Sequence, residues 1–347
     1  MNDREILIIK GDEVGTLLRG RERELIETVR LAYIAHRRGD SALPHSTFLR
    51  FPDDEHNRVI ALPAFLGDDF SVAGIKWVSS FPDNIDAGLD RASAVVILNS
   101  VSTGRPETIL EGSQISAKRT AASAALAAQV LAGSKSLYEV GLIGCGLINF
   151  EVVRFILAAF PGLNHLIAFD LNFSRAEQFA KSVRSDLGEL KVTITRRPEA
   201  VLETARVVSI ATTAIRPHIR DLSMCVPRAT ILHLSLRDIA PEVMITCNNI
   251  VDDVDHVCRA QTSVHLAEQV VGHRGFINCT LAEVIAGEAD QARLSDGITI
   301  FSPFGLGILD LALSVRVRDL ARSHGLGTVI DNFLPAPWRG DQESATP

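Results

Sequence analysis

The stretch Val140-Gly-Leu-Ile-Gly144-Cys-Gly146-Leu-Ile-Asn149 decides the fold of this chain of 347 residues. Its first four residues are apolar or small, as in a short buried strand, and a helical pattern follows from Ile148 to Phe160. Glycines at such a strand-to-helix turn let the backbone approach a phosphate closely, and the helix N-terminus favours an anion. The stretch therefore predicts the first turn of a dinucleotide-binding unit, with Gly144 and Gly146 at the phosphates.

A second strand-like run, His165–Phe169, ends in Asp170, at the spacing from the glycines that is expected of a ribose-binding carboxylate. This carboxylate would repel a 2′-phosphate and so favours NAD over NADP, although Arg175 lies close enough in sequence to keep NADP open. Asn149 stands where the fingerprint has its third glycine, a departure that bears mainly on helix–strand packing. A glycine turn without a cofactor is the alternative.

Strands and helices alternate from about residue 125 to residue 300, which predicts βαβ units and a parallel sheet. Ser174 is expected to cap a helix that runs to about Leu187. Further strands of this block are expected at 191–195, 207–211, 230–234 and 249–251.

The flanks of this block have a different pattern. A helix is expected near Glu22–Arg38, and a long Ala-rich helix from about Thr108 to Ala132 should connect two domains. Strands in succession indicate an α+β domain, and the C-terminal end should return to it. The expected strands are 46–50, 59–62, 72–78, 94–98 and 297–301, and a last helix is expected over 306–323.

Composition excludes several classes of protein. Hydrophobic residues make up 46% of the chain, which is ample for a buried core, and the net charge of −7 argues against nonspecific nucleic-acid binding. The five cysteines are odd in number and not closely paired, so neither a disulfide framework nor a zinc site is indicated. We expect no bound metal, no signal peptide, no membrane span and a cytoplasmic location.

Two cations interrupt apolar or small-residue sequence. Lys76 lies in Gly74-Ile-Lys-Trp-Val78, where a lysine is costly unless it is paired or functional; an edge-strand lysine that reaches solvent is the alternative. Arg119, early in the Ala-rich helix, could bind a carboxylate with two hydrogen bonds or form an ordinary surface ion pair. Arg50 and Arg91 carry little signal by themselves.

Asp238 ends the stretch His233-Leu-Ser-Leu-Arg-Asp238, directly after a strand-like run. The carboxyl end of a parallel strand is where α/β sheets bind ligands, and a carboxylate there could take a proton from an amine or a water. A helix N-cap or turn aspartate is the alternative. The chain has no Gly-x-Ser-x-Gly elbow and no Gly-Lys-Ser/Thr phosphate loop.

Taken in order, these motifs resemble the ornithine cyclodeaminase/μ-crystallin family over about residues 1–330. The motifs are Gly74-Ile-Lys76-Trp-Val78 with Pro82-Asp-Asn84, Lys118-Arg119-Thr120-Ala-Ala122, Ile143-Gly-Cys-Gly146, Asp238 after the fifth strand of the dinucleotide unit, and Phe304-Gly305 with Asp310.

The resemblance implies an α/β chain in which a Rossmann-type parallel-sheet domain is inserted into an α+β domain for substrate binding and dimerisation. We expect the substrate domain over 1–120 plus 302–347, the NAD domain over 121–301, and a homodimer. Asp238 is implied as the acid/base residue, with Lys76 as an alternative, and Arg50, Lys76, Arg91 and Arg119 as substrate-binding residues. The cofactor-binding residues implied are Thr120, Gly144, Gly146, Leu147, Ile148, Asp170, Arg175, Thr212, Ser235 and Pro303.

Within the family the chain is most similar to the dehydrogenases of 2,3-diaminopropionate biosynthesis in siderophore and peptide-antibiotic pathways. The stretches that carry this likeness are Phe81-Pro-Asp-Asn84, 90–99, 111–120 and 251–259. The likeness implies NAD-dependent oxidation of N-(2-amino-2-carboxyethyl)-L-glutamate to an imine, whose hydrolysis gives 2-oxoglutarate and L-2,3-diaminopropionate.

Other activities of the family stay open. Ornithine cyclisation is disfavoured, because the Lys-Thr pair that cyclodeaminases carry after the aspartate is absent from Ile239-Ala-Pro-Glu-Val243. An imine reductase, another amino-acid dehydrogenase and a non-catalytic crystallin-like binding protein are the remaining alternatives. The binding protein would have no need of Asp238.

Overall fold

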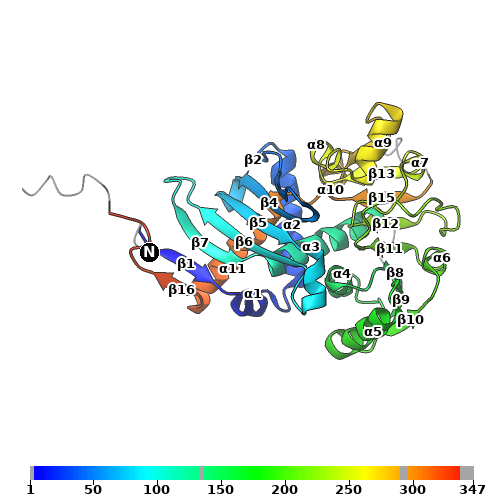
Figure 1. Cartoon of the computed structure of the whole chain (residues 1–347), viewed down its shortest axis with the longest axis horizontal. Helices are drawn as coiled ribbons and strands as arrows, with labels where there is room; N and C mark the ends of the chain where they lie inside the picture. Colours follow the sequence, from blue (N-terminus) through cyan, green and yellow to red (C-terminus); the bar gives the residue numbers. More distant parts are fainter. Residues whose placement is uncertain (1–3, 133–135, 290–295, 337–347) are drawn as a thin grey trace, which may run out of the picture. The chain divides into compact units, whose positions relative to one another are not determined.

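The computed structural model describes residues 4–132, 136–289 and 296–336. The chain divides into two compact units (Figure 1). Unit 1 comprises residues 1–19, 41–115 and 310–347, and unit 2 comprises residues 20–40 and 116–309. Each unit has its own sheet, and the two are described separately.

Unit 1 is built on a mixed sheet with the strand order β16-β1-β7-β6-β5-β4-β2, to which β3 is added by pairing with β4. The helical segments of this unit are α1 (Gly11–Leu18), the 3-10 turns η1 (Asp68–Phe70) and η2 (Pro82–Ala87), and most of α11 (Gly307–His324). The strands are β1 (Ile6–Ile9), β2 (Ser41–Ala42), β3 (Thr47–Phe51), β4 (Asp54–Leu66), β5 (Val72–Ser80), β6 (Ala92–Asn99), β7 (Pro106–Glu111) and β16 (Thr328–Ile330).

The two faces of this sheet differ because side chains alternate along each strand. On one face Leu62 and Val96 are buried, and α11 packs there closely enough that a Cβ on Gly74 would lie 3.0 Å from Leu311. On the other face Trp77 and Val95, paired across β5 and β6, remain exposed. The covered face is the core of unit 1.

Unit 2 contains an entirely parallel sheet with the order β10-β9-β8-β11-β12-β15-β13-β14. Its first five strands follow the 3-2-1-4-5 order of a doubly wound dinucleotide fold. The strands are β8 (Glu139–Ile143), β9 (His165–Phe169), β10 (Lys191–Ile194), β11 (Val207–Ile210), β12 (Thr230–His233), β13 (Asn248–Val251), β14 (Ile277–Thr280) and β15 (Thr299–Ser302).

The strands of unit 2 are connected mainly by helices (Figure 1), and strands buried on both faces make a continuous apolar core that includes Val208, Ile231 and Ile300. None of the helices that the structure describes is long and apolar enough to cross a membrane. The helices of this unit are α2 (Glu22–Arg37), most of α3 (Ser113–Leu131), α4 (Leu147–Ala159), α5 (Phe173–Leu187), α6 (Pro198–Leu202), α7 (Pro241–Met244), α8 (Val254–Val257), α9 (Ser263–Val271) and α10 (Leu281–Ala286).

The predicted fold class is confirmed, and two local predictions are wrong. Residues 106–111 form strand β7, and the helix begins only at Ser113, because the Glu111 carboxylate accepts hydrogen bonds from the first-turn amides of Ser113 and Gln114. The cap of α5 is Asn172, whose side chain accepts from the Arg175 amide, and Ser174 is already inside the helix.

Residues 20–40, expected in the substrate domain, group with unit 2. Helix α2 contacts α4 and α10, and its buried face includes Leu25 and Val29. The apolar stripe of α2 shows that the helix is buried on one side, but the stripe does not say which unit buries it.

Candidate functional site

The carboxyl ends of β9, β8, β11 and β12 lie side by side, because these four parallel strands are neighbours in the sheet of unit 2. Gly144 follows β8 with a φ of +92°, and a Cβ there would lie 2.3 Å from the carbonyl oxygen of Ala211, just past β11. Only glycine fits such a turn without moving the backbone. The close approach places Thr212 beside the glycine turn.

The turn leaves an open cradle at the start of α4. Gly146 is the N-cap residue of this helix, no side chain caps it, and a Cβ on Gly146 would meet nothing within 4 Å. The first amides of a helix have no partner within the helix, so those following Gly146 are available to a phosphate. Leu147 and Ile148 lie in this first turn. The residues present fit the pyrophosphate of a dinucleotide.

Asp170 follows β9 and is half-buried next to the cradle. Its carboxylate accepts hydrogen bonds from the backbone amides of Cys145 and Asn172, both at 2.8 Å. A carboxylate has about four acceptor positions, so oxygens fixed in this way can still accept from ribose hydroxyls.

Burial, with a contribution from Asp170, raises the pKa of Cys145 to about 12, so this thiol stays protonated. Arg175 is exposed in the first turn of α5.

Asn149, the departure from the glycine fingerprint, ties the turn together. Its buried side-chain amide donates to the carbonyl oxygens of Ile143 at 3.1 Å and Gly144 at 2.6 Å. Its oxygen accepts from the Ser209 hydroxyl of β11 at 2.7 Å. A third glycine would only let α4 approach the sheet, whereas Asn149 connects α4, β8 and β11 by hydrogen bonds.

Replacing Asn149 by Ala is expected to lower the free energy of unfolding by about 1–3 kcal/mol for each buried group left unsatisfied. The Kd for NAD should also rise, because the glycine turn loses its tether. Urea denaturation and titration with NAD measure the two effects. Ser209→Ala, which removes one of the three hydrogen bonds, is the control and should leave NAD affinity near that of the wild type. A stable Asn149→Ala variant with unchanged NAD affinity would contradict the assignment.

Asp238 is fully buried after β12, and its carboxylate has three polar side-chain partners. The hydroxyls of Thr212, after β11, and of Ser235 donate to it, and Nε2 of His233 lies 3.2 Å away and donates when that nitrogen is protonated. Burial raises the pKa of this carboxyl, but the hydrogen bonds from His233, Ser235 and Thr212 outweigh burial and lower it to about 2. The backbone before Asp238 is also constrained, since Leu236 has a φ of +68°. Asp238 is therefore an ionised group in a fixed position.

Arg119, on α3, lies against the turn that contains Pro303 and Phe304. Gly305 has a φ of +95°, and a Cβ there would come within 2.6 Å of Arg119 Nη1. The turn itself is held by the fully buried Asp252, whose carboxylate accepts from the amides of Phe304 and Gly305. Next to Arg119, the Thr120 hydroxyl donates to the Ser116 carbonyl oxygen at 2.7 Å.

Lys76, in unit 1, is buried on the face of β5 that α11 covers. Its Nζ lies 2.7 Å from Oδ2 of Asp310, and the two side chains are 2% and 0% exposed. The carboxylate stabilises the ammonium form of Lys76, which favours a fixed positive charge at this position over a free base. Lys76 is thus paired, as its apolar sequence setting required.

Three arginines lie in or next to the sheet that contains Lys76. Arg50 on β3 pairs directly with Arg58 on β4, and Arg58 pairs with Ser80 on β5. The Arg91 guanidinium reaches the Ser80 hydroxyl at 3.3 Å. Counting alternate residues along β4 and β5 puts Arg58, Ser80 and Lys76 on one face. Like charges directly opposite across strands are destabilising, and a ligand with several carboxylates would offset that repulsion.

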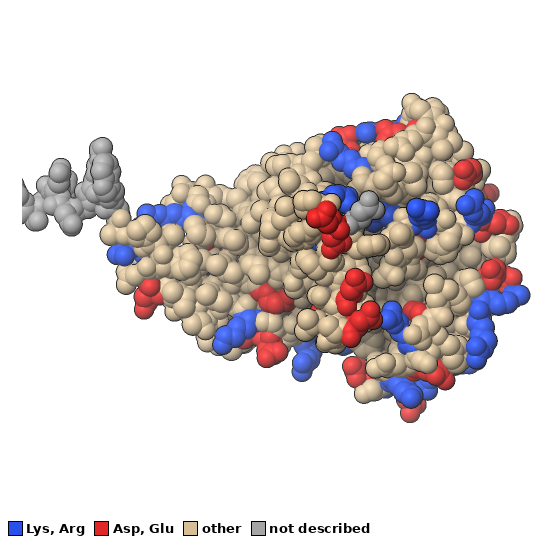
Figure 2. Space-filling model, viewed as in Figure 1, with Lys and Arg blue, Asp and Glu red and all other residues tan. Residues whose placement is uncertain are grey.

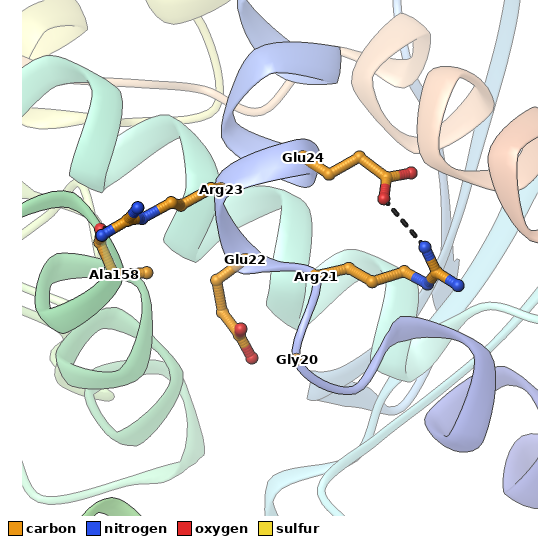
Figure 3. Close-up of a pocket in the computed structure, with 6 residues that line it drawn as sticks. All are labelled: Gly20, Arg21, Glu22, Arg23, Glu24 and Ala158. Carbon is orange, nitrogen blue, oxygen red and sulfur yellow. Dashed lines mark hydrogen bonds and ion pairs between the residues drawn. The ribbon is translucent and has the colours of Figure 1, made fainter.

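A surface hollow lies elsewhere in unit 2, lined by residues 20–24 and Ala158 (Figure 3). Within it Arg21 pairs with Glu24 at 3.0 Å, and Arg23 donates to the carbonyl oxygen of Ala158 at 2.9 Å. The acidic and basic side chains here alternate along the chain, and no predicted site residue lines the hollow. It is a solvated surface at the start of α2.

The structure groups the predicted site residues into two sets. In unit 2 it brings Gly144, Gly146, Asp170, Thr212, Ser235 and Asp238 to one edge of the sheet. In unit 1 it places Arg50 and Lys76 on one sheet, with Arg91 just before β6 and in contact with Ser80. Three buried polar residues were not predicted: Asn149 as a tether, His233 beside Asp238, and Asp252 below the Phe304–Gly305 turn. His233 could have been noticed as a polar residue at the end of an apolar strand.

Comparison with known proteins places this arrangement in a family. Residues 7–325 match the ornithine cyclodeaminase/mu-crystallin family. The chain belongs to this family. The match covers the sheet of unit 2, the sheet of unit 1 apart from β16 and the first residue of β1, and both sets of site residues, which confirms the resemblance drawn from the motifs.

Members of the family that are similar to the chain act on different amino acids. The chain is 26% identical over 337 residues to the N-((2S)-2-amino-2-carboxyethyl)-L-glutamate dehydrogenase of Staphylococcus aureus, covering 95% of this chain and 100% of that protein. It is 28% identical to the alanine dehydrogenase of Archaeoglobus fulgidus, over 95% and 99% of the two chains. The solved structure of an archaeal alanine dehydrogenase dimer with bound NAD matches with a TM-score of 0.83 and 27% identity, over 94% and 99% of the chains.

Proposed function

We propose that the chain is an NAD-dependent oxidoreductase that oxidises the secondary amine of N-(2-amino-2-carboxyethyl)-L-glutamate, releasing 2-oxoglutarate and L-2,3-diaminopropionate. The class, an NAD-dependent dehydrogenase or reductase of the ornithine cyclodeaminase family, agrees with the relatives named above. The observation that favours this substrate is the set of Arg50, Arg58 and Arg91, in and next to the sheet that also carries the buried Lys76. The substrate has three carboxylates, which such a set of fixed cations suits.

Each step needs a defined contribution from the chain. Bound NAD supplies the acceptor for the hydride that leaves the glutamate Cα. The amine must first lose a proton, because its lone pair forms the new C=N bond, and the Asp238 carboxylate takes that proton. Hydrolysis of the imine then needs an activated water, and the same carboxylate can accept its proton. Arg50, Arg91, Arg119 and Lys76 hold the carboxylates and orient the amine.

Cofactor binding follows the geometry of unit 2. The amides after Gly146 bind the pyrophosphate, and Asp170 accepts hydrogen bonds from the ribose hydroxyls, with Arg175 at the edge of that position. Thr212 and Ser235 hold Asp238 at the end of the same strands. None of the five cysteines forms a disulfide in the described structure, which agrees with a reducing, cytoplasmic setting for the enzyme.

A substrate panel tests the function. Purified protein with NAD and the glutamate conjugate should produce NADH together with 2-oxoglutarate. Conversion of ornithine to proline without net NADH would instead indicate a cyclodeaminase, and NADH formation from alanine alone would indicate an alanine dehydrogenase. Either result without turnover of the conjugate would refute the proposed substrate.

Arg58→Gln sharpens the test. Loss of one charge-assisted hydrogen bond to a carboxylate, about 1.5–3 kcal/mol, should raise KM for the conjugate about tenfold or more. Arg19→Gln is the matched control, because Arg19 is an exposed arginine of the same unit, outside the arginine set. An unchanged KM in the Arg58 variant would contradict a role for this arginine in substrate binding.

We also propose a homodimer that forms through the uncovered face of the unit 1 sheet. Leu49, Phe65, Trp77 and Val95 are exposed on β3, β4, β5 and β6, and the surface over β5, β6 and β7 carries few charges in the view of Figure 2. A contiguous apolar patch of this kind is typical of a protein interface. Light scattering should give twice the chain mass of 37.6 kDa, and a monomer at micromolar concentration would refute the proposal.

A further inference from the structure

His233 is the last residue of β12, and its ring is completely buried between two polar groups of unit 2. On one side Nδ1 lies 3.2 Å from the hydroxyl of Ser302, the last residue of the neighbouring strand β15. On the other side Nε2 faces Asp238. Of the ionisable groups that the structure describes, Asp238 is the one that contacts this ring.

Nε2 of His233 has a partner for either protonation state. Without a proton, this nitrogen can accept a hydrogen bond from the backbone amide of Asp238 at 3.2 Å. With a proton, it can donate to Oδ2 of the same residue, also at 3.2 Å. A backbone amide can only donate, so its hydrogen bond to Nε2 places the proton of the neutral ring on Nδ1, 3.2 Å from the Ser302 hydroxyl. Nε2 of the ring therefore has a hydrogen-bond partner in either protonation state.

Asp238 by itself is poorly suited to keep a proton. Burial opposes its ionised form, but hydrogen bonds from the protonated His233 ring and from the Ser235 and Thr212 hydroxyls lower the pKa of its carboxyl. An imidazole nitrogen is a stronger base than a carboxylate whose ionised form is stabilised in this way. A proton that arrives on Asp238 thus has a better acceptor one hydrogen bond away.

We propose that His233 and Asp238 act as one buried imidazole–carboxylate pair, in which His233 holds the proton that Asp238 removes from the substrate amine. The proton passes from the amine nitrogen to a carboxylate oxygen of Asp238 and then to Nε2 of His233, and no electrons are transferred in this step. The backbone amide of Asp238 favours the tautomer with its proton on Nδ1, so that Nε2 is the nitrogen free to accept, and the Ser302 hydroxyl can accept from Nδ1–H. The inference rests on the proposed function only in taking Asp238 as the group that meets the amine.

His233→Gln tests this role in the full-length enzyme at saturating NAD. Glutamine can still donate a hydrogen bond to Asp238, but it cannot hold a proton. We expect kcat to fall roughly 10–100-fold. The acid limb of the pH profile of kcat should move to lower pH or disappear, because protonation of His233 no longer blocks proton removal.

Ser302→Ala is the second variant, since it keeps the imidazole but removes the partner of Nδ1. It should lower kcat in the same direction, because the ring can then adopt the tautomer whose Nε2 cannot accept a proton. The Kd for NAD and the urea midpoint, measured for both variants, separate this effect from misfolding. If His233→Gln does not fold, the pH profile of Ser302→Ala decides the question.

Two outcomes would overturn the inference. One is a His233→Gln enzyme with a kcat within about twofold of wild type, and the other is a lower kcat with an unshifted acid limb, which would mean a purely structural role. The pH profile is measured with whichever amine substrate the wild type oxidises. A failure of the glutamate conjugate as substrate therefore stays distinguishable from a failure of the His233 pair.

Discussion

Asp238→Asn is expected to lower kcat by about 10²–10⁴-fold while the Kd for NAD stays close to the wild-type value. Asparagine has nearly the same shape and can keep hydrogen bonds to Thr212 and Ser235, so the turn after β12 should be preserved. What it loses is the ability to take a proton from the substrate amine. Steady-state NADH formation and titration with NAD separate the two quantities.

The control for this variant is Asp186→Asn, which changes an exposed carboxylate on α5 of the same unit. It should behave as the wild type in both measurements. If Asp238→Asn instead weakened NAD binding and left kcat unchanged at saturating NAD, Asp238 would be a cofactor-positioning group and the acid/base assignment would be wrong.

Asp310→Asn is expected to lower the free energy of unfolding by about 3–5 kcal/mol, because it leaves the Lys76 ammonium buried without its carboxylate. The two side chains are 2% and 0% exposed, so solvent cannot replace the lost partner. Urea denaturation at neutral pH measures the loss. Lys76→Met should destabilise unit 1 for the converse reason, since it leaves the Asp310 carboxylate buried.

A double-mutant cycle completes this test. Lys76→Met combined with Asp310→Leu removes both charges, and most of the lost stability should return, because an apolar pair avoids the desolvation cost of the ions. The exposed pair of Arg197 and Glu203 is the comparison, and breaking it should cost less than about 1 kcal/mol. If single variants of Lys76 and Asp310 each lowered the free energy of unfolding by less than about 1 kcal/mol, the buried ion pair would not hold α11 to β5.

The dinucleotide unit was predictable because its signals are local. A strand, two glycines and a following helix lie within a few residues, and the same order of elements gives a parallel sheet whatever the rest of the chain does. The start of α3 was mispredicted because the strand before it is specified by non-local pairing. Thr108 and Leu110 are buried by pairing of β7 with β1 and β6, and sequence neighbours alone do not reveal such partners.

In the candidate site, too, some features were recognisable from local sequence and others depended on contacts between distant segments. Lys76 stood out in the sequence because a charge in an apolar run must be paired or used, and Asp238 stood out because it follows a strand-like run. Their partners could not be read there, since Asp310 lies 234 positions from Lys76 and Ser302 lies 69 positions from His233. The pairing of Arg50 with Arg58 likewise depends on the register of β3 with β4.

By itself the sequence determined the α/β class, the glycine turn at Gly144 and Gly146, and the type of chemistry that Lys76, Arg119 and Asp238 can perform, because these depend on residue type and short-range spacing. Only the tertiary structure decided how deeply these groups are buried and which partners they have. Both are set by strands and helices distant in the chain, and both determine the charge that a group carries. Asn149 shows the difference most clearly: in sequence it is a missing glycine, and in the fold it is the tether of the turn.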